Sequence, residues 1–221
     1  VPPVSSVRLP GQQPRIFLPA LPNRLESPCL ASLHSQTQDT LLSRNGIIFS
    51  MSELIGEAYP GCEVCDILEH DKNEEFAMLF RGQYWTASLR DRDQTLLGTT
   101  FITLRRHAQE LDHLTKEEDA EFIVVRNSLI RAIRETFKPI TFNLSCLKND
   151  TFKHDITVPP EATHVHWHLK PRYGEAPVEY AGETFQDPAP GLYLSGFKRH
   201  EPPREVAEQI AEAIKSNLPP N

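Results

Sequence analysis

The sequence has few cysteines, fewer basic than acidic residues and no long apolar run. Four cysteines in 221 residues are too few for a disulfide framework. The 30 acidic residues outnumber the 23 Lys and Arg, and the formal charge of −7 argues against broad attraction to nucleic acid or anionic membranes. No segment approaches the roughly 20 apolar residues of a membrane span, and no signal-peptide pattern opens the chain. We therefore expect a cytoplasmic protein with one compact domain and some appendages.

The first 50 residues differ from the rest. They hold seven prolines, four Arg and two acids, without a sustained apolar period, and we expect residues 1–50 to be a disordered leader or extension. Met51 is a candidate start, and an organellar presequence is the alternative reading of the preceding residues. The ordered domain is expected at 51–200, and a C-terminal helix and tail at 201–221.

The ordered part reads as an antiparallel sheet with one long helix. Aromatic and β-branched residues predict strands at 75–80, 84–89, 99–104, 140–147 and 163–169. Thr115 and Glu118 form a capping-box pattern, and apolar residues then recur at helical spacing until Pro139. A final helix is expected from about Arg204. The predicted fold class is α+β, an antiparallel sheet packed with one long helix and a C-terminal helix.

Three histidines alternate in HVHWHLKPRY, at His164, His166 and His168. In a strand they would form a row on one face, while the apolar residues between them point to the other face. A solvated strand face or a metal-adhering patch is the simple explanation. The alternatives are a metal site or a site for a phosphoryl group.

Two known metal patterns fit this stretch poorly. The metallo-hydrolase pattern H-x-H-x-D-H needs an Asp in place of His168, and the cupin arrangement needs a Glu where the chain has Lys170, Pro171 and Arg172. Elsewhere, Cys62 and Cys65 have the C-x-x-C spacing that suits metal or redox chemistry.

HVHWHLKPRY resembles the H-φ-H-φ-H-φ-φ signature, with φ apolar, of the histidine triad (HIT) superfamily of nucleotide hydrolases and nucleotidyl transferases. LRDRDQTLLGTTFITLRRH (89–107) is similar to the family's nucleoside-binding hairpin, and SCLKND (145–150) to the strand end that offers an Asn to the phosphate. YAGETFQDP is similar to the tail of a bacterial branch. The resemblance covers about 62–190 and implies a HIT-like fold and a homodimer.

The resemblance also assigns roles to residues of the triad and around it. His166 would attack the α-phosphate and carry the nucleotidyl group, for which an imidazole with a pKa near 6.5 is suited. His164 completes the triad, and a protonated His168 would stabilise phosphate oxygens or assist the leaving group. Asp91 would accept the ribose hydroxyls and Asn149 would donate to a phosphate oxygen. A charged turn is the plain alternative for Asp91, and a loop-shaping role for Asn149.

Zinc-bearing branches of the family bind one structural Zn²⁺ through a C-x-x-C pair and two histidines. Carried over by position, the ligands are Cys62, Cys65, His107 and His164. Two thiolates and two imidazoles would complete a closed tetrahedral site. A vestigial site or a redox pair is the alternative, and His70 and His113 are competing ligands.

One departure from the family pattern concerns substrate choice. Many members have a Ser or Thr three residues before the first triad histidine, where this chain has Glu161, and a carboxylate repels a phosphate unless it points away. We expect a hydrolase acting at the α-phosphate of a nucleoside conjugate, either a dinucleoside polyphosphate or a nucleoside phosphoramidate. The alternatives are a nucleotidyl transferase or phosphorylase, and a non-catalytic nucleotide-binding module.

Overall fold

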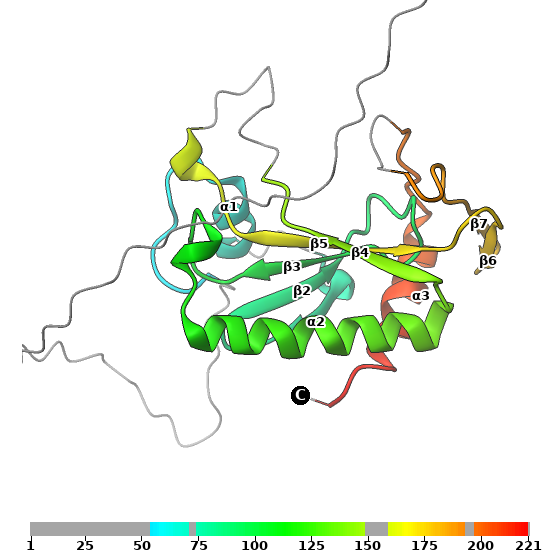
Figure 1. Cartoon of the computed structure of the whole chain (residues 1–221), viewed down its shortest axis with the longest axis horizontal. Helices are drawn as coiled ribbons and strands as arrows, with labels where there is room; N and C mark the ends of the chain where they lie inside the picture. Colours follow the sequence, from blue (N-terminus) through cyan, green and yellow to red (C-terminus); the bar gives the residue numbers. More distant parts are fainter. Residues whose placement is uncertain (1–53, 71–73, 149–158, 193–196, 221) are drawn as a thin grey trace, which may run out of the picture. The chain divides into compact units, whose positions relative to one another are not determined.

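The computed structural model describes residues 54–70, 74–148, 159–192 and 197–220 (Figure 1). All of them belong to one compact unit, Ile48–Asn221. The expectations for residues 1–50 and for Asn149 lie outside the described residues. Within those ranges, no helix combines the length and apolar character needed to cross a membrane.

A five-stranded antiparallel sheet forms the centre of the fold, in the order β1-β2-β3-β5-β4. Its strands are β1 (Met78–Arg81), β2 (Trp85–Leu89), β3 (Thr100–Leu104), β4 (Thr141–Ser145) and β5 (His166–Arg172). The predicted fold class is confirmed. The expectation of a strand over 75–80 was partly wrong, because Glu75–Ala77 form a 3₁₀ helix, η1, and β1 begins only at Met78.

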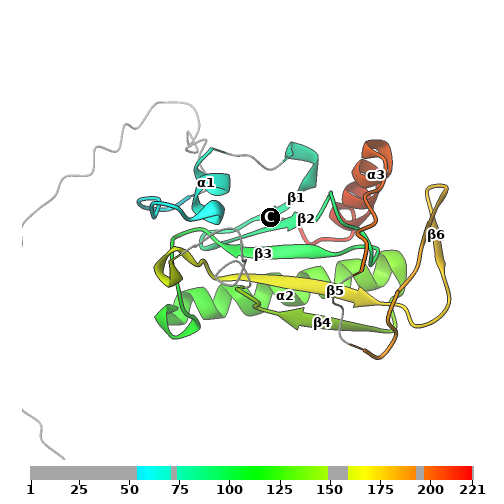
Figure 2. The same ribbon diagram turned by 90° about the horizontal axis from the view of Figure 1, so that it is seen from above.

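The long helix α2 (Lys116–Phe137) runs along one face of the sheet (Figures 1 and 2). Its capping box is complete, since Thr115 accepts from the Glu118 amide and Glu118 accepts from the Thr115 amide. Lys138 ends the helix in the left-handed region, at a φ of 53°, just before Pro139. The buried apolar side chains of α2 are Phe122, Val125, Leu129, Ala132, Ile133 and Phe137. Each full burial of such a large side chain contributes roughly 1.5–3 kcal/mol, so this face fixes the helix on the sheet.

Helix α3 (Arg204–Lys215) begins where the sequence predicts and packs against α2, β1 and η1. Its buried face holds Val206, Ala207, Ile210, Ala211 and Ile214. These residues join the side chains of α2 and the sheet in a single hydrophobic core. Val165, just before β5, and Leu169 on β5 are both fully buried in that core.

The histidine-bearing strand is shifted along the chain relative to the expectation of 163–169. β5 covers His166–Arg172, because a 3₁₀ turn (Pro160–Ala162) and an irregular stretch precede it. The strand also continues through Pro171. There β5 has only β4 as a neighbour, since its pairing with β3 ends at Leu169, and a residue without an N–H is tolerated in such a place.

One helix and one β-hairpin were not expected from the sequence. Helix α1 (Glu63–Glu69) begins after Cys62, whose sulfur accepts from the Cys65 amide. Strands β6 (Val178–Tyr180) and β7 (Glu183–Phe185) form a short hairpin. Its two turn residues, Ala181 and Gly182, both have positive φ, as two-residue hairpins of the I′ type require.

Candidate active site and metal-ligand cluster

His166 lies at the start of β5, between β3 and β4, on the sheet face opposite the core. Its Nδ1 lies 2.9 Å from the carbonyl oxygen of His164. Because a carbonyl only accepts, Nδ1 carries the proton and Nε2 carries the lone pair. The geometry therefore leaves the Nε2 lone pair of this half-buried imidazole without the proton.

His168 stands beside His166, with 5.1 Å between the ring centroids. Its pKa is lowered to about 3, mainly by burial, with the neighbouring ring of His166 and two cations adding to the effect. Its Nδ1 is buried without a hydrogen-bond partner among the described residues. The ring is therefore neutral at pH 7, whereas the sequence argument expected a protonated one. A phosphate anion beside the ring would raise its pKa, so protonation would depend on substrate.

The Phe101 ring packs against the imidazole rings of His166 and His168. Its ring makes an edge contact with His168 at 4.8 Å and with His166 at 6.1 Å between centroids. A small pocket of about 30 Å³, room for one or two water molecules, opens beside His166 and is also lined by Lys148 and Thr163. The rings are thus held by packing while His166 borders a cavity.

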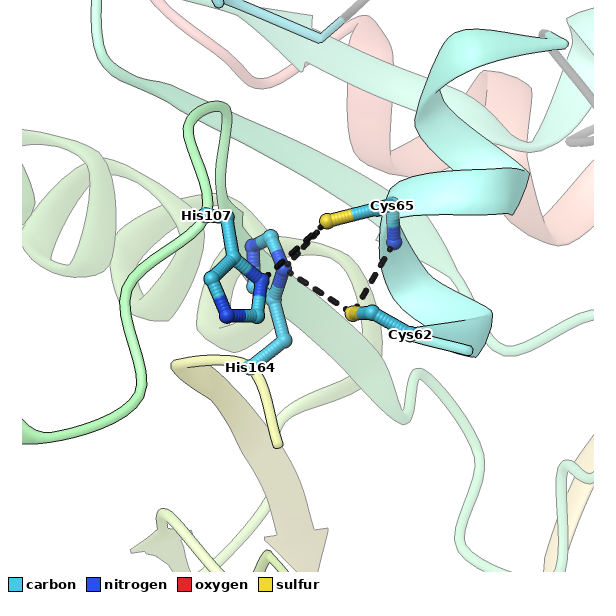
Figure 3. Close-up of side chains that lie close together, drawn as sticks. All are labelled: Cys62, Cys65, His107 and His164. Carbon is cyan, nitrogen blue, oxygen red and sulfur yellow. Dashed lines mark hydrogen bonds between the residues drawn. The ribbon is translucent and has the colours of Figure 1, made fainter. Parts of the chain in front are cut away.

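Four side chains from three separate segments meet at the other end of the histidine row (Figure 3). Their ligand atoms all lie within 4.8 Å of one another, and they belong to Cys62, Cys65, His107 and His164. Cys65 Sγ lies 3.2 Å from His107 Nδ1 and 3.4 Å from His164 Nδ1, and Cys62 Sγ lies 3.6 Å from His164 Nδ1. These are the four residues that the resemblance selects.

Backbone carbonyls orient both imidazoles of this cluster. His164 Nε2 donates to the Leu104 carbonyl at 2.7 Å, and His107 Nε2 donates to the Glu161 carbonyl at 2.9 Å. Each Nδ1 therefore turns its lone pair toward the cysteines, which is how outer partners orient metal-binding histidines. The donor set, two sulfurs and two such nitrogens, fits a tetrahedral zinc ion.

The two cysteines shift each other's pKa in opposite directions. A hydrogen bond between the side chains lowers the pKa of Cys65 to about 7 and, together with burial, raises the pKa of Cys62 to about 11. No disulfide occurs among the described residues, so the pair is present as thiols. A cation at the cluster would lower the pKa values of both thiols.

A buried ion pair fixes the loop that carries His107. Glu118, at the start of α2, accepts from Arg106 Nε at 2.5 Å and from Arg106 Nη2 at 2.8 Å. Arg106 also donates to the carbonyls of His107 and His113. Glu118, the glutamate of the α2 capping box, thus fixes the loop that carries His107 through Arg106.

Asp91, His70 and His113, which the sequence also suggested, lie outside the metal-ligand cluster and the pair of His166 and His168. Asp91 lies partly exposed in the turn after β2. His70 contacts Asp66 and is exposed, and exposed His113 lies near Asp112. Neither competing histidine belongs to the described metal-ligand cluster.

The Glu161 side chain is exposed, and only its carbonyl contacts the cluster, through His107. The pocket lining beside His166 does not include Glu161.

Two cations near the site, Arg90 and Lys170, were not among the site residues predicted from the sequence. Lys170 occupies the last apolar place of the triad signature, and this departure was the available signal.

No family model and no curated protein matches the chain. Among solved structures, a Hit-like protein involved in cell-cycle regulation from Bartonella henselae has 17% identity, covers 73% of this chain and 100% of its own, and gives a TM-score of 0.51. A hypothetical histidine triad nucleotide-binding protein from Sulfolobus tokodaii has 18% identity, with 71% and 91% covered and a TM-score of 0.49. A zinc-bound histidine triad family protein from Mycobacterium smegmatis has 21% identity, with 70% and 93% covered and a TM-score of 0.46.

At these identities the likeness shows the fold and no more. The chain therefore has the α+β fold of histidine triad proteins, with His166 and His168 on strand β5 and His164 just before it. The resemblance drawn from the sequence is confirmed at this level.

Proposed function

We propose that the chain is a HIT-type enzyme that hydrolyses or transfers the nucleotidyl group of a nucleoside conjugate through a covalent intermediate on His166. The observation that carries this proposal is the hydrogen bond from His166 Nδ1 to the His164 carbonyl. It fixes the tautomer in which Nε2 is the nucleophile, on a sheet face away from the hydrophobic core.

The chemistry has two steps that both take place at the α-phosphorus. His166 Nε2 attacks, a phosphorus–nitrogen bond forms, and the bond from phosphorus to the leaving group breaks. An acceptor hydroxyl then attacks the same phosphorus, the phosphorus–nitrogen bond breaks, and the acceptor proton leaves with solvent or with the neighbouring imidazole. We assign His168 to hydrogen bonding with phosphate oxygens, since its ring stands 5.1 Å from that of His166. Water as the acceptor gives hydrolysis, inorganic phosphate gives phosphorolysis, and another acceptor gives nucleotidyl transfer.

We assign Cys62, Cys65, His107 and His164 as ligands of one structural zinc ion, on the strength of their donor geometry. The bound ion would supply rigidity, because it would join α1, the loop after β3 and the start of β5. His164 would then serve two purposes. Its side chain would bind the ion, and its carbonyl accepts the hydrogen bond from His166.

We test the proposed reaction with an adenosine polyphosphate in heavy-oxygen water. Attack at the α-phosphorus places the heavy oxygen in the adenylate product, whereas attack further along the chain places it in the other product. His166→Asn should reduce turnover by about three orders of magnitude or more, since covalent catalysis is lost, and exposed His113→Asn should retain it. Unchanged turnover in His166→Asn would refute the role of this residue.

A non-catalytic nucleotide-binding module predicts a different pair of results. Nucleotide affinity would be unaffected by loss of His166, and no conjugate would be turned over by the wild type.

The homodimer remains a prediction from the resemblance, and light scattering after gel filtration would test it.

A further inference from the structure

Two cations extend the histidine row along the open face of the sheet. Lys170 follows His168 by two residues on β5, so both side chains share one face, and Asn143 lies opposite Lys170 on β4. The Arg90 guanidinium lies over the Phe101 ring, 5.4 Å from its centroid. Since Phe101 pairs with His168, Arg90 and Lys170 both belong to the surroundings of His168.

The charges of this group are not balanced. Arg90 contacts Asp93 at 3.2 Å, but the same carboxylate oxygen also lies 3.8 Å from Arg199. The other oxygen of Asp93 is used by Thr95. No hydrogen bond or ion pair of Lys170 Nζ occurs among the described residues. One carboxylate, Asp93, therefore contacts two guanidinium groups and acts on the half-buried ammonium only at longer range.

The pKa values are consistent with this excess of positive charge. Burial lowers the pKa of Lys170 and the nearby Arg90 lowers it further, while Asp93 acts in the opposite direction without cancelling them. Burial also lowers the pKa of Arg90, against the opposing effect of Asp93. A half-buried cation that lacks a partner is costly, and an anion that binds beside it removes that cost.

Lys170 also borders a groove of about 550 Å³ over the outer strand β4. The groove is lined on its polar side by Thr141, Asn143, Ser145, Lys170 and Arg172. Arg172 is already neutralised by buried Asp187, at 2.6 Å, and donates to Asn143. Lys170 is thus the cation of this described lining that has no anionic partner.

We propose that Lys170 and Arg90 form a subsite for a second phosphate group of the substrate, in addition to the α-phosphate at His166. The inference rests on the proposed function, because it takes the nucleotide as the ligand. Lys170 follows His166 by four strand residues, about 13 Å along the sheet, and its flexible stem reduces the gap between the two phosphates. The second phosphate belongs either to the 5′ chain or to the ribose.

This subsite would favour dinucleoside polyphosphates over nucleoside phosphoramidates as substrates, two classes between which the triad alone does not discriminate. A nucleoside phosphoramidate carries a single phosphate and leaves Lys170 without a partner. A conjugate with two or more phosphates occupies both positions. The HIT signature has an apolar residue where this chain has Lys170, so the resemblance assigns no role to this cation.

Titration calorimetry with three probes tests the proposal without requiring turnover. The probes are adenosine 5′-monophosphate, the methylene-bridged analogue of adenosine 5′-diphosphate, and adenosine 3′,5′-bisphosphate. At least one of the two doubly phosphorylated probes should bind the wild type about tenfold or more tightly than the monophosphate, as a charge-assisted contact predicts. The methylene-bridged probe would identify the 5′ chain as the source, and the bisphosphate would identify the ribose.

Variants at position 170 show whether that gain depends on the ammonium group. Lys170→Met keeps the apolar stem and should abolish the gain while leaving monophosphate affinity within about twofold. Lys170→Arg should retain the gain, and so should Lys116→Met, a control at an exposed position of α2. Thermal unfolding verifies that each variant is folded.

Two results would overturn the subsite. One is equal affinity of the wild type for all three probes, and the other is a gain that persists in Lys170→Met. If the monophosphate itself fails to bind, the proposed function falls and this inference falls with it. Monophosphate binding without any gain removes only the subsite.

Discussion

Replacing Glu118 with Gln should make the stability of the protein less dependent on acid pH. The Glu118 side chain is 3% exposed and accepts two hydrogen bonds from Arg106 and one from the Thr115 amide. Burial by itself raises the pKa of Glu118, but the bonds from Arg106 and Thr115 outweigh it, and the pKa lies below its ordinary value. The carboxylate is therefore stabilised by folding.

The size of the effect follows from the geometry of the pair. Breaking one partner of a buried ion pair costs about 3–5 kcal/mol, and the Arg106 side chain is 32% exposed, so we take about 3 kcal/mol at pH 7. Because the pKa of Glu118 is lower in the folded than in the unfolded state, this contribution is present above about pH 4.5. It is lost as the pH falls through the folded-state pKa. The difference between wild type and Glu118→Gln should then narrow toward pH 3.

Urea unfolding at several pH values between 7 and 3 measures this difference directly. Glu117→Gln is the matched control, since Glu117 lies exposed in the same turn of α2 and carries the same charge toward the helix dipole. The control should change the free energy of unfolding by about 0.5 kcal/mol or less. A difference for Glu118→Gln that stays constant with pH, or that matches the control, would refute the reasoning.

Two further outcomes concern the metal-ligand cluster and the triad. Cys65→Ser should lower the zinc content from about one per chain to near zero and reduce the melting temperature by about 10 °C or more. The control variant Cys146→Ser, at a residue outside the cluster, should keep the metal. Unchanged zinc content in Cys65→Ser would exclude Cys65 as a ligand. His168, with a pKa of about 3, should show no ring titration by nitrogen NMR between pH 8 and pH 5, and a midpoint near 6.5 would contradict its burial.

Helices α2 and α3 and the strands of the main sheet were predictable because their signals are local. The capping box at Thr115 and Glu118 marks the first turn of α2, and Pro139 follows its end. The register of β5 was less accessible. Its start depends on the 3₁₀ turn at Pro160–Ala162, and its extension to Arg172 depends on pairing with β4, which is a tertiary property.

The metal-ligand cluster was predictable only through the family resemblance. Its four residues are spread from Cys62 to His164, and neither spacing nor composition brings them together. The backbone carbonyls that set the two tautomers carry no sequence signal. The role of Glu118 in holding Arg106 was likewise not visible, since the capping box explains that residue without the ion pair.

The cations beside His168 show where a motif can mislead. Treating Lys170 as part of the signature hides that a charged residue occupies an apolar place. Its position on the histidine face follows from strand alternation, which was available from the sequence. The proximity of Arg90 was not, because it depends on the packing of the guanidinium over Phe101.

The central claim is that the Nε2 atom of His166 takes up a nucleotidyl group, and intact-mass spectrometry after rapid acid quenching tests it most directly. Wild-type protein mixed with an adenosine polyphosphate should gain the mass of one adenylyl group, with fragmentation placing it on His166, and His166→Gly should gain none. An adduct of the same yield in the glycine variant, or turnover by the wild type with no adduct at any quench time, would contradict the account.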